Sequence, residues 1–121
     1  MERLFSLDEA NQLLPTLRDL LERLRATRTA VQEQARRATR RAAGNGSALA
    51  AASGSNAEEV FNQALGEIEA LGVVVRDPES GLVDFAATRD GEPIYLCWRL
   101  EEDEVGFWHP RDSGFAGRQP L

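Results

Sequence analysis

The chain has 121 residues and a formal net charge of −6, with 42% hydrophobic and 28% charged residues. This length suits a single domain, residues 1–121, with one core of modest size, and no apolar run is long enough to span a membrane. The negative charge argues against a nucleic-acid-binding protein, because contacts to phosphates dominate that affinity.

A long helix is predicted near the start of the chain. Ser6 and Glu9 match a capping box, so the helix should begin at Leu7. Pro15 lacks a backbone N–H and crowds the preceding turn, so we expect the helix to kink or to restart there. An apolar face then continues at helical spacing toward Ala42, through Leu13, Leu14, Leu17, Leu20, Leu21, Leu24 and Val31.

A second helix is predicted after a connecting loop. Residues 44–55 are rich in glycine, serine and alanine and exceed the usual length of a helix–helix connection, so we expect a flexible loop. Ser55 and Glu58 offer a second capping box. Apolar residues follow at helical spacing, and Gly72 is a suitable terminator. Residues 1–72 are therefore predicted to form a helical hairpin.

Residues 73–121 are predicted to form a β-meander and a C-terminal tail. Four segments have the composition of short strands: residues 73–75, 82–87, 93–100 and 104–109. Asp90 and Gly91 form a strong signal for a two-residue hairpin. The predicted fold class is α+β, with a long helical hairpin, its first helix kinked near Pro15, packed on a three- to four-stranded antiparallel β-meander.

The hairpin turn fixes which side chains share a face of the sheet. It pairs Asp84 with Cys97, and side chains alternate between the two faces along each strand. If the next loop contains two or four residues, the face covered by the helices collects Val83, Phe85, Ile94, Leu96, Trp98, Val105, Phe107 and His109. The opposite face collects Asp84, Tyr95, Cys97, Arg99, Glu104, Gly106 and Trp108. We expect this second face to be covered by the tail, by another subunit or by a ligand.

Most of the candidate site residues lie on this second face or in the tail, and His109 lies at the end of the last predicted strand. The candidate ligand-binding residues are Asp84, Tyr95, Cys97, Trp108, His109 and Arg118. A cysteine and a histidine could form a nucleophile–base pair, but the predicted register places Cys97 and His109 on opposite faces. We therefore assign no catalytic residue.

A divalent-metal site is a further possibility. His109 and Asp112 are the candidate metal ligands, with the acids of residues 101–104 nearby, although no cofactor is strongly implied. Asp84 is unusual in the middle of a strand, and an unpaired buried carboxylate would be costly. We expect it to pair with Arg99 or Arg118.

Five blocks of sequence resemble a known family. They comprise residues 5–15 (FSLDEANQLLP), 81–85 (GLVDF), 95–98 (YLCW), 108–109 (WH) and 114–118 (GFAGR). In this order they look like an uncharacterised prokaryotic family, domain of unknown function 2203. The resemblance covers the chain apart from the central loop and implies a small cytoplasmic protein, without an activity, a cofactor or an established site. Glu101 and Glu102 stand where family members tend to have Gly-Glu.

Two functions from different classes remain open. The preferred one is a non-enzymatic assembly or regulatory module that forms a homodimer or another homo-oligomer, because the leucine-striped helix and the second sheet face exceed what one small core can cover. The alternative is a small-ligand- or divalent-metal-binding protein, or an enzyme, that uses the second face and the tail. The single cysteine excludes an internal disulfide and fits a cytoplasmic location.

Overall fold

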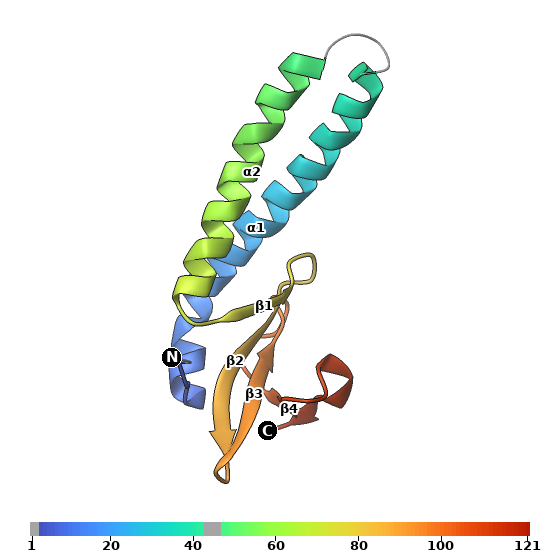
Figure 1. The fold of residues 1–121 in the computed structure, drawn as a ribbon. Coiled ribbons are helices and arrows are strands. Elements are labelled where there is room, and N and C mark those ends of the chain that lie inside the picture. Colours follow the sequence, from blue (N-terminus) through green and yellow to red (C-terminus); the bar gives the residue numbers. More distant parts are fainter. Residues whose placement is uncertain (1–2, 43–46) are drawn as a thin grey trace.

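The computed structural model describes residues 3–42 and 47–121, with side chains described for residues 3–40 and 56–121. It confirms the α+β fold. Two helices, α1 (Leu7–Ala42) and α2 (Ser47–Ala70), form a hairpin, and a five-stranded antiparallel sheet follows. Figure 1 shows that the hairpin extends far beyond the sheet, which lies beside the start of α1 and the end of α2.

The predicted capping box begins α1. The Ser6 N–H donates to Glu9 Oε1 at 3.0 Å, and the Glu9 N–H donates to Ser6 Oγ at 3.1 Å. Pro15 lies inside the helix, so α1 continues through it and does not restart there. The leucine stripe is buried on both sides of the proline, at Leu14, Leu17, Leu20, Leu21 and Leu24.

The second helix begins earlier than the sequence predicted. It starts at Ser47, so residues 47–55, expected as a loop, are helical, and Ser55 is not the N-cap. Alanine has the highest helix propensity, and the alanine-rich segment outweighs the cost of one glycine. Residues 44–46 of the predicted loop lie outside the described part of the chain. Gly72 adopts a φ of 88° and follows the end of the helix, as predicted.

The sheet contains one strand more than predicted, and its strands follow chain order. They are β1 (Val74–Asp77), β2 (Leu82–Arg89), β3 (Glu92–Trp98), β4 (Phe107–Pro110) and β5 (Gln119–Pro120). A short 3-10 helix, η1 (Phe115–Gly117), precedes β5. Strand β5, which pairs with β4, is only two residues long and is too short to show the hydrophobic periodicity from which a strand is predicted.

The predicted pairing of β2 with β3 is confirmed. Asp84 lies opposite Cys97, and Asp90 and Gly91 take the positive φ values that a two-residue hairpin requires. The helices cover the predicted core face, where Val83, Phe85, Ile94, Leu96, Trp98 and Val105 are buried against the leucines of α1. The core is therefore positioned largely as the alternating pattern indicated.

The predicted orientation of β4 is wrong. Tyr95 lies opposite His109 and Leu96 opposite Trp108, so His109 belongs to the second face and Trp108 packs against the core. The last paired residues of β3 and β4 are Cys97 and Phe107, and residues 98–106 between them are odd in number and exceed the expected loop of two or four residues. Side chains hold this loop: the Arg99 N–H donates to Glu102 Oε1 at 2.7 Å, and the Val105 N–H donates to Asn11 Oδ1 at 2.8 Å.

Within the described residues, neither helix combines the length and the hydrophobicity needed to cross a bilayer. The exposed side of α1 is rich in arginine and glutamate.

Candidate functional site

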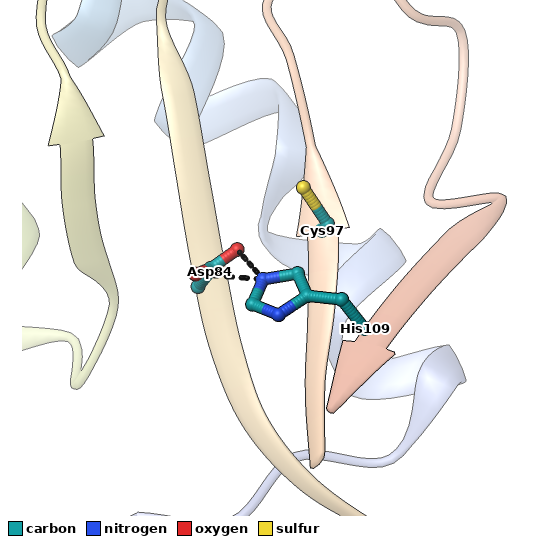
Figure 2. Close-up of side chains that lie close together, drawn as sticks. All are labelled: Asp84, Cys97 and His109. Atoms are coloured by element: carbon teal, nitrogen blue, oxygen red, sulfur yellow. Dashed lines mark hydrogen bonds and ion pairs between the residues drawn. The ribbon is translucent and has the colours of Figure 1, made fainter. Parts of the chain in front are cut away.

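Three side chains from three strands converge on the second face of the sheet. Asp84 comes from β2, Cys97 from β3 and His109 from β4, and Figure 2 shows Asp84 and His109 pointing toward each other with the Cys97 side chain beside them. One carboxylate oxygen, the thiol sulfur and one imidazole nitrogen all lie within 4.8 Å of one another. All three residues are buried, with exposed fractions of 2% or less. The orientation of β4 creates this cluster, which is why the sequence did not predict it.

The His109 ring is held by hydrogen bonds at both nitrogens. Its Nδ1 lies 2.8 Å from the carbonyl oxygen of Pro110. A carbonyl only accepts, so Nδ1 carries a proton and donates it. The other nitrogen, Nε2, lies 3.1 Å from both carboxylate oxygens of Asp84. Nε2 therefore either donates a second proton to Asp84 or presents its lone pair to a bound cation.

The arginine partner of Asp84 differs from the prediction. Arg76 Nε donates to Asp84 Oδ2 at 2.8 Å, and this bond is the main cause that raises the pKa of Arg76. Arg76 lies where the β1–β2 register shifts between Val75 and Asp77, and such a bulge re-aims a side chain. The predicted strand ended at residue 75, so sequence analysis missed Arg76.

The two arginines that were expected to pair with Asp84 are bound elsewhere. Arg99 pairs with Glu101 at 2.9 Å. Arg118 pairs with Glu102, donates to the carbonyl oxygen of Cys97 at 3.4 Å, and stacks over the Phe107 ring. Its side chain is only 10% exposed. Arg118 therefore fixes the tail against the sheet and does not contact the carboxylate of Asp84.

The Cys97 thiol is in an environment that opposes ionisation. Burial is the main cause that raises its pKa to about 11, and the negative charge of Asp84 acts in the same direction, whereas Arg118 partly opposes them. Activated cysteine nucleophiles show the opposite shift. The structure thus overturns the register argument against a Cys97–His109 pair, but the thiol does not have the environment of a nucleophile.

A cavity of about 290 Å³ opens beside the cluster. Its walls come from the sheet and from the residues that follow β4, namely Arg76, Leu82, Asp84, Cys97, His109, Arg111, Asp112, Ser113, Gly114 and Phe115. Both predicted metal ligands, His109 and Asp112, therefore border it, although Asp112 is exposed. The tail covers part of the second face, and the cavity lies between the two.

Two further residues complete the surroundings of the cluster. The Tyr95 ring lies 5.5 Å from the His109 ring, measured between centroids. The guanidinium carbons of Arg76 and Arg111 lie 5.0 and 4.7 Å from the Tyr95 centroid. Of the candidate ligand-binding residues, the structure thus groups Asp84, Tyr95, Cys97 and His109 and leaves Trp108 on the core side. Arg111 was missed because it follows a proline at a predicted strand end, without a periodic signal.

The fold and the site define a small α+β protein with a buried Asp–Cys–His cluster beneath a tail-covered cavity. The model of the uncharacterized conserved protein family DUF2203 matches residues 3–121, so the chain belongs to this family. This confirms the resemblance seen in the five sequence blocks. No curated protein and no solved structure matches the chain.

Proposed function

We propose that the protein binds a divalent transition-metal ion of the zinc type through Asp84, Cys97 and His109. The observation that carries this proposal is the convergence of a carboxylate oxygen, a thiol sulfur and an imidazole nitrogen within 4.8 Å. Catalytic zinc sites combine three such ligands with a fourth position that is open to water or substrate. The neighbouring cavity would supply that open position.

The donor types favour zinc over other common ions. Magnesium and calcium prefer oxygen ligands only, whereas a set with one thiolate and one imidazole suits zinc and similar borderline metals. A structural zinc site would use four protein ligands. Within the described residues, the cluster offers three, so the proposed site is of the open kind.

The surroundings of the three ligands resemble the outer shell of a metal site. A metal-bound histidine usually donates its other N–H to a carbonyl or a carboxylate, and His109 Nδ1 donates to the Pro110 carbonyl. A metal-bound carboxylate is usually hydrogen-bonded as well, and Arg76 bonds to Oδ2 of Asp84. Oδ1 can then face the ion while Oδ2 keeps its bond to Arg76.

Metal binding would also change the state of the thiol. With a pKa of about 11, Cys97 is protonated at neutral pH in the metal-free protein. A coordinating thiol is deprotonated, so zinc binding would release the thiol proton to solvent, and the proton that lies between His109 Nε2 and the Asp84 carboxylate would leave as well. The ion would supply the positive charge that makes a buried thiolate tolerable.

Cobalt titration tests this proposal directly, because cobalt(II) occupies zinc sites and reports its ligands in its absorption spectrum. We expect a thiolate-to-cobalt charge-transfer band in the wild type that zinc abolishes. Cys97→Ser should lose the band. It should also weaken zinc binding by at least the ~10–100-fold that loss of an outer-shell partner costs.

Asp112→Asn is the matched control, because it removes a carboxylate from the cavity but not from the cluster. It should keep the band and the zinc affinity. Weakened zinc binding in Asp112→Asn, with Cys97→Ser unaffected, would instead support the pair His109 and Asp112. A wild type without the band, or with zinc affinity equal to that of Cys97→Ser, would reduce the cluster to a buried ion-pair network.

A second candidate function, self-association, is favoured by the far half of the helical hairpin. Among the side chains described for residues 25–40 and 56–63, none is buried, whereas Leu24 and Ala64 next to them are. Val31 and Phe61 line a groove of about 360 Å³ between the helices. An apolar seam of two helices needs a further covering element, and a second copy of the chain would complete a four-helix arrangement.

Light scattering of Phe61→Glu tests self-association. We expect a dimer mass for the wild type and a monomer mass for the variant, because the new carboxylate would be buried in the interface. Gln63→Glu is the control, since it adds the same charge at an exposed position of the same helix. A monomer mass for the wild type at high concentration would exclude the second copy. The tail already covers part of the second sheet face, so that face no longer argues for a second subunit. Only the far half of the helical hairpin supports self-association.

A further inference from the structure

We infer that the cavity binds a small ligand through an anionic group, a carboxylate or a phosphate, which Arg76 and Arg111 hold next to the metal ion. The inference rests on the proposed metal site and names the class of ligand that its open position would take. It is carried by the charges that border the cavity, by the way the two arginines are held, and by the size of the space.

The charges around the cavity favour an anion once a metal is bound. A divalent ion bound by the Cys97 thiolate and the Asp84 carboxylate is formally neutral with its ligands, and His109 adds no charge. Arg76 and Arg111 also line the cavity, together with one further carboxylate, that of Asp112. Asp112 is exposed to solvent, where its charge is screened. The cavity therefore keeps a net positive charge beside the open coordination position.

Tyr95 holds both arginines at the cavity. Their guanidinium carbons lie 5.0 and 4.7 Å from the centroid of its ring, within the range of a cation–π contact. Stacking fixes the plane of a guanidinium group and reduces the entropy lost when it binds a ligand. Arg76 bonds Asp84 through Nε, so the forked end of its guanidinium, which also interacts with Tyr95, faces the cavity side of the carboxylate and can donate to a ligand oxygen. Planar, forked donors of this kind match carboxylates and phosphates.

The dimensions of the cavity limit the ligand to a small molecule. Its volume of about 290 Å³ is at the lower end of the range for small-molecule sites, roughly 300–1,000 Å³. Leu82 and Phe115 contribute apolar walls, so the ligand can carry a short apolar portion in addition to its anionic group. A peptide or a polynucleotide would not fit. The geometry thus points to a small organic acid or a small phosphate compound.

Calorimetry with zinc-loaded protein tests the inference, with succinate as the carboxylate probe and inorganic phosphate as the phosphate probe. Arg111→Met should weaken binding of the preferred probe by about tenfold or more, the loss expected for one hydrogen bond between charged groups. Arg111→Lys keeps the charge but not the fork, so it should recover only part of the affinity. Comparison of the two probes identifies the preferred anion.

Arg89→Met is the matched control. Arg89 also stacks on an aromatic ring, with its guanidinium carbon 4.6 Å from the Trp108 centroid, but it does not line the cavity. Its substitution should leave anion affinity within about twofold of the wild type. Thermal melting of each variant shows whether it is folded, so that a loss of binding is not mistaken for unfolding.

The outcomes separate this inference from the metal proposal, because zinc is titrated independently. Normal zinc binding without succinate or phosphate binding would overturn the anion inference alone, and so would equal anion affinities in Arg111→Met and the wild type. A failed zinc titration would contradict the metal proposal. The same anion titrations on metal-free protein would then show whether the arginines bind anions without a metal: Arg111-dependent binding supports the anion site, and no binding removes it.

Discussion

His109 Nε2 lies 3.1 Å from both carboxylate oxygens of Asp84, although the two residues come from strands that are not neighbours. Strands β2 and β4 flank β3, so they are about two strand spacings, roughly 10 Å, apart. The two side chains meet over β3, and Cys97, which comes from β3, lies beside them. A cross-strand contact of this length brings three different donor types together without any sequence motif.

The buried carboxylate should make a large contribution to stability. Asp84→Ala would leave His109 without an acceptor and Arg76 without its ion pair, and loss of one partner of a buried pair costs ~3–5 kcal/mol. We expect a loss of about 3 kcal/mol or more in urea denaturation. Arg76→Met should cost less, because the Arg76 side chain is 43% exposed and water can screen its charge.

Asp84→Asn separates charge from shape in the same experiment. It keeps the hydrogen-bonding oxygen and the size of the side chain, so we expect a smaller loss than for Asp84→Ala. If both variants unfold at the same urea concentration as the wild type, the carboxylate does not stabilise the fold. Its burial would then have to be explained by ligand binding alone.

Much of the fold could be predicted because local signals set it. The capping box of Ser6 and Glu9, the leucine stripe of α1 and the hairpin at Asp90 each depend on residues close in sequence, and each is observed. The start of α2 was missed because glycine and serine indicated a loop, whereas the alanines between them favour a helix. The composition of this segment was therefore compatible with both a loop and a helix.

The site could be predicted only in part, because it depends on whether the number of residues that connect β3 to β4 is odd or even. The residue types were identified, but whether His109 faces Cys97 or the core depends on whether the connection from β3 to β4 is odd or even. That connection is set by long-range bonds such as the one from Val105 to Asn11, which is 94 residues away. No short-range pattern contains this information, and the bulge that directs Arg76 toward Asp84 is hidden in the same way.

The Cys97 thiol should react slowly with alkylating agents in the metal-free folded protein. Its pKa of about 11 means that only a small fraction is thiolate at neutral pH, and the residue is buried. We expect the rate of iodoacetamide labelling to rise as the pH increases toward 11 and to increase sharply in denaturant. Rapid labelling of folded protein at neutral pH would contradict the assigned environment and would favour a nucleophilic role.

The capping box should make stability depend on pH in the acidic range. Bonds from the backbone and the side chain of Ser6 lower the pKa of Glu9 below its ordinary value. A carboxyl with a lower pKa in the folded state adds stability above its unfolded-state pKa, and this contribution is lost as the pH falls through the folded-state pKa. Glu9→Gln should therefore reduce the difference in stability between neutral and acidic pH. Ser6→Ala should cost about 1 kcal/mol at neutral pH, measured by urea denaturation.

Two glycines should respond in opposite ways to the same substitution. Gly81 has a φ of 70°, and an added Cβ would lie 2.6 Å from Leu100 Cβ, so the side chain would be both strained and crowded. Backbone strain at such a position costs ~1–3 kcal/mol, and we expect Gly81→Ala to lower the free energy of unfolding by at least this amount. Gly66 lies within α2 with nothing near an added Cβ. Gly66→Ala should raise the free energy of unfolding by roughly 0.5–1 kcal/mol. Urea denaturation of both variants tests the turn before β2, and a neutral Gly81→Ala would show that this turn does not constrain the strand that carries Asp84.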